Sequence, residues 1–129
     1  MKINLYGPSL LRITLGIVLL AHGLLKLLVF SLAGTAAYFE SLGLPGFSAY
    51  LVTFGEIGLG LALILGIYSN IAAALSLPIL AGATFVHLGN GWLFSNEGGG
   101  WEFPALLVIV ALVVAIQDNK LLSLAKASN

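Results

Sequence analysis

Six ionisable residues lie within, or at the ends of, long apolar segments of the chain. They are Arg12, His22, Lys26, Glu56, His87 and Glu102. An ionised side chain at the centre of a bilayer costs about 2.5 to 3.5 kcal/mol even on a lenient scale, so such residues usually have a partner or a function. Histidine and carboxylate groups can give or take protons, which suits proton relay and quinol chemistry. We therefore treat these six residues as the candidate site.

The spacing of the first three residues indicates that they share one face of a helix. His22 and Lys26 are one helical turn apart, and Arg12 lies within about 40° of Lys26 around the axis. Because a charge facing lipid is costly, this face should point into the interior of a bundle. Counting about 1.5 Å per residue, all of the candidates except Arg12 fall in the outer half of the membrane. We expect a polar pocket that opens outward.

The candidates divide into two groups by their chemistry. The residues expected to handle protons, and so to be catalytic, are His22, Glu56 and His87. The residues expected to bind or to form a charge network are Arg12, Lys26 and Glu102. By depth and side-chain length, Arg12 is the better partner for Glu56, so we predict an ion pair between these two.

Structural roles remain open for the same residues. A bridge to Arg12 would neutralise Glu56 without any catalysis, and each histidine could be a hydrogen-bonded packing residue. Lys26 lies where a lysine can extend to the membrane surface. Two imidazoles and a carboxylate would suit a transition metal, but no close histidine pair supports one, and we predict no metal site.

The composition indicates that these residues belong to a membrane protein. The chain has 129 residues, of which 60% are hydrophobic and 8% are charged. A membrane span needs about 20 apolar residues, so this length allows four spans with short connections. Basic and acidic residues balance at five each, which argues against a nucleic-acid partner. Cysteine is absent, so electron transfer would need a bound cofactor rather than the chain's own sulfur.

The apolar runs predict an all-α, integral membrane four-helix bundle that forms a single domain over residues 1–129. The predicted spans are approximately 8–29, 47–68, 71–88 and 102–116. A short interfacial helix is expected over 35–42, followed by a turn at Gly43 to Gly46. A wet, glycine-rich loop is expected between the last two spans, with Trp92, Phe94 and Trp101 as interfacial aromatic residues.

Small residues recur at four-residue spacing in the second and third spans. The two stripes are Gly58, Ala62 and Gly66, and Ala74, Pro78 and Gly82. Such stripes let helix backbones approach closely, within one bundle or between protomers. A homo-oligomer and a complex with a partner enzyme both remain open.

The distribution of basic residues predicts the orientation in the membrane. Lys2, Lys120 and Lys126 flank one side, whereas Glu40 and Glu97 lie in the loops of the other. Basic residues favour the cytoplasmic side, so both termini should be cytoplasmic.

The order of several short motifs resembles the DoxX family of small inner-membrane proteins. The matching residues are Arg12, Gly16, the segment 20–26 (LAHGLLK), Gly43-Leu44-Pro45, Glu56, Gly58, Leu65-Gly66, His87 and Glu102-Phe103-Pro104. The similarity extends from about Leu10 to Ile116, and the tail from Gln117 onward departs from the usual family ending.

The resemblance implies a multi-pass protein of the bacterial inner (plasma) membrane with a four-helix fold. Members of the family are linked to thiosulfate oxidation with quinone as acceptor, to oxidative stress, and to catechol or quinone detoxification. We therefore expect an oxidoreductase component that binds a quinone or a small hydrophobic ligand. The alternative is a non-enzymatic membrane subunit that binds a lipid or other small molecule, or anchors a partner protein.

Overall fold

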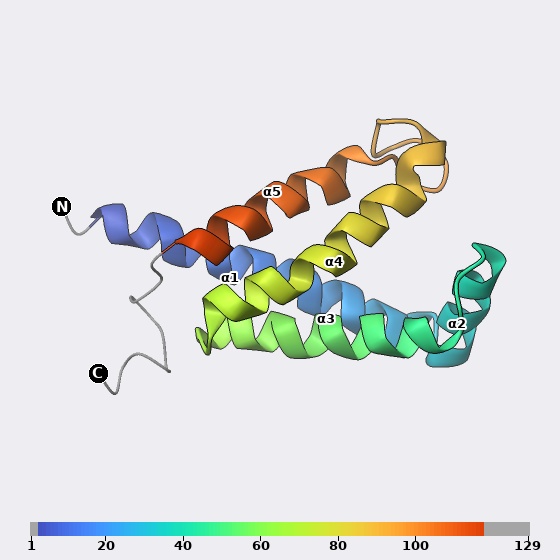
Figure 1. Ribbon diagram of the computed structural model, residues 1–129, viewed down its shortest axis with the longest axis horizontal. Coiled ribbons are helices and arrows are strands. Elements are labelled where there is room, and N and C mark those ends of the chain that lie inside the picture. The colour runs from blue at the N-terminus through green and yellow to red at the C-terminus, as the bar shows by residue number, and fades with distance from the viewer. Residues whose placement is uncertain (1–2, 118–129) are drawn as a thin grey trace.

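The computed structural model describes residues 3–117, and its regular secondary structure over that range is helical, with no β-strand (Figure 1). The helices are α1 (Ile3–Leu24), which continues into the π-helical turn η1 (Leu25–Val29), α2 (Leu32–Ser41), α3 (Phe47–Leu65), α4 (Ser69–His87), the 3-10 turn η2 (Leu88–Asn90) and α5 (Glu102–Ile116). The predicted fold class, all-α with membrane-spanning helices, is confirmed. The basic tail residues that were used to predict orientation lie outside the described residues.

The helix boundaries differ from the predicted ones where local backbone chemistry overrides the apolar pattern. The second long helix ends at Leu65 rather than at residue 68, because Gly66 adopts a left-handed conformation with φ of 74° and terminates the helix. The short helix α2 begins earlier than predicted because Ser31 caps it, accepting a hydrogen bond from Gly34 N at 3.0 Å. The last helix has the predicted bounds.

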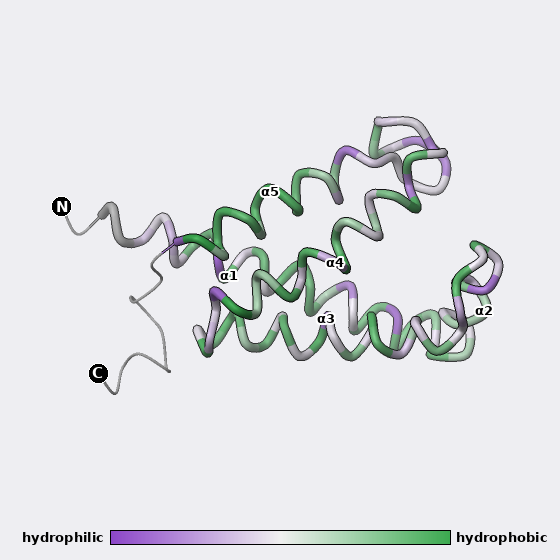
Figure 2. The backbone as a smooth tube through the Cα atoms, in the orientation of Figure 1, coloured by the Kyte–Doolittle hydropathy of each residue, from purple (hydrophilic) through white to green (hydrophobic). Residues whose placement is uncertain are grey.

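Three helical segments are long and apolar enough to cross a membrane. They are Tyr6–Val29, Phe47–Leu65 and Ser69–Asn90. The fourth apolar helix, α5, has 15 residues and is therefore about 22 Å long, shorter than a hydrocarbon core of about 30 Å. Figure 2 shows that apolar residues extend along the four long helices, with polar residues at turns and loops and at a few positions within the helices. Large apolar side chains such as Phe85 and Ile116 face outward, as expected for a surface in contact with lipid.

The helices form two antiparallel pairs that diverge like a wedge. Helix α1 packs along α3, and α4 packs along α5 (Figure 1). The pairs are close together near the tight turn between α3 and α4, and they separate toward the end that carries α2 and the α4–α5 loop. The apolar core fills the narrow part with Leu15, Leu19, Leu63, Ala73, Ala111 and Val114. The wide part is left for the polar candidates.

Helices α1 and α3 touch through their backbones. A Cβ atom added at Gly16 would lie 2.7 Å from Gly60 O, and one added at Gly60 would lie 2.7 Å from Leu20 N. Gly58 and Gly82 of the predicted stripes make no such contact within the bundle, because an added Cβ there would meet nothing within 4 Å. Four-residue spacing alone therefore did not identify the glycines at the contact between α1 and α3, because it does not say which face of a helix meets its neighbour.

This contact can be tested with two glycines of α3 that differ in surroundings but not in helical context. Gly60→Ala should lower the free energy of unfolding relative to Gly58→Ala by about 1 to 3 kcal/mol, the usual cost of overpacking. Both changes gain the same helix propensity, so their difference isolates the clash. Thermal unfolding in detergent, followed by tryptophan fluorescence, measures it. Equal stability of the two variants would contradict the close approach.

Candidate functional site

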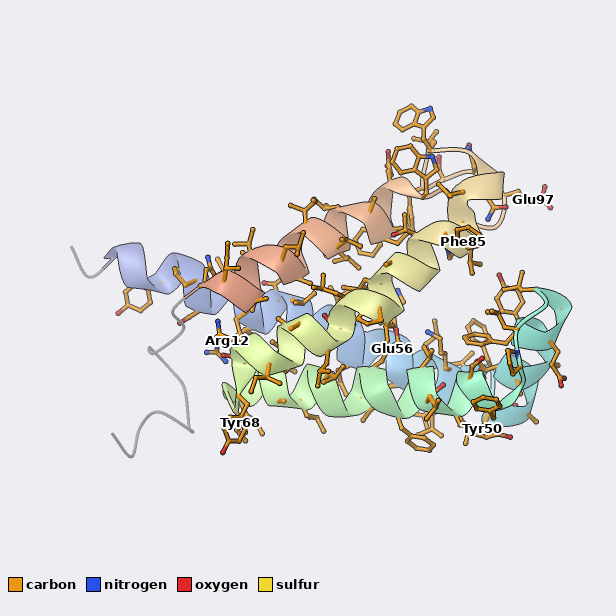
Figure 3. All side chains as sticks on the ribbon, in the orientation of Figure 1. Arg12, Tyr50, Glu56, Tyr68, Phe85 and Glu97 are labelled. Atoms are coloured by element: carbon orange, nitrogen blue, oxygen red, sulfur yellow. The ribbon has the colours of Figure 1, made fainter. Side chains whose placement is uncertain are left out.

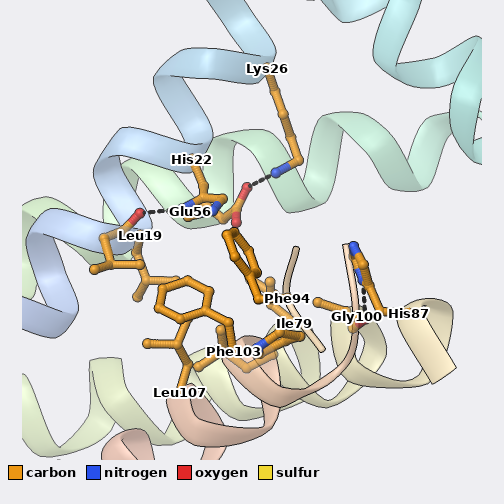
Figure 4. Close-up of a pocket in the computed structure, with 14 residues that line it drawn as sticks. Leu19, His22, Lys26, Glu56, Ile79, His87, Phe94, Gly100, Phe103 and Leu107 are labelled. Atoms are coloured by element: carbon orange, nitrogen blue, oxygen red, sulfur yellow. Dashed lines mark hydrogen bonds and ion pairs between the residues drawn. The ribbon is translucent and has the colours of Figure 1, made fainter. Parts of the chain in front are cut away.

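A cavity of about 170 Å³ lies in the wide part of the wedge (Figure 4). Its walls come from α1, η1, α3, α4, the α4–α5 loop and α5. Four of the six predicted site residues line it: His22, Lys26, Glu56 and His87. The rest of the lining is mostly apolar, including Leu19, Ile79 and Leu107. The fold therefore collects two imidazoles, an amine and a carboxylate at one apolar cavity.

The centre of the charged group is an ion pair between Lys26 and Glu56. Lys26 Nζ donates to Glu56 Oε1 at 2.8 Å, and the Glu56 side chain is only 7% exposed. Lys26 is 19% exposed and lies in the π-helical turn that ends the first span. A buried carboxylate in a membrane helix needs such a partner. Lys26, which was assigned to a charge network and could alternatively have extended to the membrane surface, is the partner of this carboxylate.

The predicted ion pair between Arg12 and Glu56 is therefore wrong. Arg12 Nη1 donates instead to the carbonyl oxygens of Leu63 at 2.5 Å and Ile64 at 3.3 Å. These carbonyls belong to the last turn of α3, where no intrahelical N–H is available to them. Figure 3 shows Arg12 toward the Tyr68 end of the molecule, with Glu56 near the middle. Arg12 thus stabilises the end of a helix and does not line the cavity.

The register of α1 on α3 explains this difference. Gly16 lies opposite Gly60 in this antiparallel pair. Arg12 lies four residues from Gly16 toward one end of the pair. Glu56 lies four residues from Gly60 toward the other end. The two are therefore separated by about 12 Å along the helix axes. The sequence-based depths assumed that both helices begin at the membrane boundary, and that assumption fails here.

Each histidine is held by its own helix. His22 Nδ1 donates to Val18 O at 2.8 Å, and His87 Nδ1 donates to Ala83 O at 2.7 Å. Both acceptors are the carbonyl four residues earlier, so the two rings are oriented by the same local bond. His22 lies beside Glu56, whereas His87 lies on the opposite side of the cavity (Figure 4).

Two phenylalanines complete the cavity wall. The ring of Phe103 stacks on His22 with centroids 6.4 Å apart, and Phe94 meets Phe103 edge-on at 5.5 Å. The sequence analysis assigned Phe94 to the membrane interface and gave Phe103 no role. The signal that could have found them is their position on either side of the glycine-rich loop, which folds back over the cavity.

Glu102 lies outside the cavity. It is the first residue of α5, and its backbone N–H donates to Trp92 O at 3.0 Å, closing the α4–α5 loop. An acidic residue in the first turn also interacts favourably with the helix dipole. Within residues 3–117, no three histidine or acidic side chains come together as metal ligands.

A pair of double-mutant cycles distinguishes the two possible partners of Glu56. Lys26→Met and Glu56→Gln should show a favourable coupling above about 1 kcal/mol, because they share one buried ion pair. Arg12→Met and Glu56→Gln should add to within about 0.5 kcal/mol, because they share no contact. The free energies of unfolding in detergent give both values. A larger coupling for Arg12 would restore the pairing expected from the sequence.

Comparison with known proteins places this arrangement in a family. The family model for DoxX matches residues 7–89. A protein of Bacillus subtilis (strain 168) named "Putative oxidoreductase CatD" is 32% identical over 118 residues, which cover 92% of this chain and 84% of the relative. No solved structure matches the chain. The matched residues include the whole of α1 from Gly7, all of α3 and α4, and the four polar residues of the cavity, and the chain belongs to the DoxX family.

Proposed function

We propose that this protein is the ligand-binding component of a quinone-linked oxidoreductase in the bacterial inner membrane. The observation that carries the proposal is the cavity, in which aromatic rings stand next to a buried ion pair and two histidines. The name of the Bacillus relative supports the same class of activity.

The size of the cavity suits one substituted six-membered ring. An apolar cavity of about 150 Å³ is known to take benzene, and this cavity has about 170 Å³. Phe94 and Phe103 offer ring faces and edges to an aromatic ligand. The polar groups lie on two sides of the cavity, with His22, Lys26 and Glu56 on the side of α1, η1 and α3 and His87 on the side of α4. A bound ring would therefore have proton-exchanging groups on both sides and apolar contacts with the rest of the lining.

The polar residues match the proton demand of quinone chemistry. Reduction of a quinone to its quinol takes up two electrons and two protons, and oxidation of the quinol releases them. His22, Glu56 and His87 line the cavity, and each can give or take a proton. The electrons would pass to or from a partner redox protein, which is why we propose a component rather than a complete enzyme.

The ion pair of Glu56 with Lys26 favours a second, non-enzymatic role. The Glu56 carboxylate is already neutralised by Lys26 at 2.8 Å, as in a purely structural ion pair. A subunit that holds a lipid or a small molecule, or that anchors a partner protein, would need no proton transfer. This alternative differs from the first in having no redox activity.

Bound ligand distinguishes the two roles. Protein solubilised gently from its native membrane should carry a quinone detectable by mass spectrometry and by redox difference spectra. Glu56→Gln and His87→Ala should lower the affinity for this ligand by roughly fivefold, because each removes about one hydrogen-bond acceptor for a hydroxyl group of its quinol form. Thr84→Val is the matched control, because Thr84 donates to Leu80 O within α4 and does not line the cavity. Protein that is redox-silent and empty but holds a partner chain would favour the subunit role.

We further propose a multi-pass topology with both termini cytoplasmic and the cavity toward the outside. Because the chain has no cysteine, single cysteines report sidedness without background. In intact cells with the outer membrane permeabilised, a membrane-impermeant maleimide should label Glu97→Cys but not Ser128→Cys. The reverse pattern would invert the orientation and place the cavity toward the cytoplasm.

A further inference from the structure

The hydrogen bonds of the two histidines determine which ring nitrogen of each is left as an acceptor. A carbonyl oxygen only accepts, so Nδ1 of His22 and Nδ1 of His87 must each carry a hydrogen. In the neutral imidazole the other nitrogen, Nε2, then has a free lone pair. Within residues 3–117, neither Nε2 has a hydrogen-bond partner. The backbone thus fixes both rings in the same tautomer.

Glu56 adds a third acceptor. Its Oε1 accepts from Lys26, while its Oε2 has no partner in the described part of the chain and projects toward Phe94 (Figure 4). The donor among the polar side chains of the cavity is the Lys26 ammonium group, which keeps two hydrogens beyond the one given to Glu56. With both histidines neutral, acceptors therefore outnumber donors at the cavity.

We propose that the cavity selects the reduced, dihydroxy form of an aromatic ligand over its quinone form. This inference rests on the proposed function and adds to it which redox form of the ligand binds more tightly. The two hydroxyl groups donate to acceptors of the cavity, with the histidine Nε2 atoms as the principal ones. A hydroxyl oxygen can also accept from Lys26, so a dihydroxy ring satisfies both kinds of group.

A quinone matches the same walls less well. Its carbonyl oxygens only accept, so they can pair with Lys26 but not with either Nε2 or with Glu56. A polar group left unpaired in an apolar site loses binding free energy, and one hydrogen bond corresponds to about a fivefold change in affinity. The aromatic contacts with Phe94 and Phe103 are available to both forms, so the hydroxyl groups decide the preference.

Three probes of the same ring separate these effects. Hydroquinone has two donors, 1,4-benzoquinone has two acceptors, and 1,4-dimethoxybenzene has oxygen atoms without donors. Binding to the full-length protein in nanodiscs is measured anaerobically by ligand-observed NMR, with empty nanodiscs subtracted. Hydroquinone should bind at least about fivefold more tightly than either of the other two.

His22→Gln and His87→Gln test the residues that we hold responsible. A glutamine amide can present either a donor or an acceptor, so each change should bring the hydroquinone to benzoquinone affinity ratio closer to one. Thr84→Val should leave the ratio unchanged. The ratio in the unmodified protein decides the question even where a variant fails to fold.

The outcomes separate this inference from the proposed function. Benzoquinone binding as tightly as hydroquinone would overturn the inference and leave a quinone-binding protein. Failure of all three probes to bind would overturn both. A hydroquinone preference that persists in both glutamine variants would overturn the assignment of the histidines as the acceptors.

Discussion

The backbone contact between α1 and α3 is the constraint on which the other features depend. In lipid there is little hydrophobic force between helices, so close packing of small residues has to hold them together. Gly16 and Gly60 permit that approach, and they set the register of one helix on the other. Lys26 reaches Glu56, and Arg12 reaches the end of α3, only in this register. The charge pairing of the protein follows from the position of two glycines.

The cavity follows from the unequal lengths of the helices. Helix α5 has 15 residues against 19 in α4, so the chain between them must turn back within the wide end of the wedge. Two backbone hydrogen bonds, from Trp101 N–H to Gly91 O and from Glu102 N–H to Trp92 O, fix the path of this loop. The loop thereby carries Phe94 over the polar residues, and Phe103 follows in the first turn of α5. A longer fourth helix with a short turn would not bring a loop aromatic to this position.

The sequence predicted the helices and the chemistry of the site better than its contacts. Ionisable residues in apolar segments are costly, and this argument alone identified four residues that line the cavity. The pairing of Glu56 was missed because depth counting ignores register, which depends on Gly60 meeting α1 some 40 residues earlier in the chain. The partner of Arg12 was missed because it is backbone, and side-chain patterns do not reveal free carbonyls at a helix end. Phe94 was missed because it comes from a loop, whose path the apolar pattern does not predict.

The choice of lysine over arginine at Glu56 also bears on what the site can do. Arginine binds a carboxylate through a planar fork that can engage both oxygens, whereas lysine is a point charge on a flexible chain. Lys26 contacts one oxygen of Glu56 and leaves the other toward the cavity. It also lies in a π-helical turn, a form that is frequent at functional sites. The residue that neutralises Glu56 thus leaves one carboxylate oxygen without a hydrogen-bond partner among the described residues, while Arg12 binds two carbonyl oxygens at the end of α3.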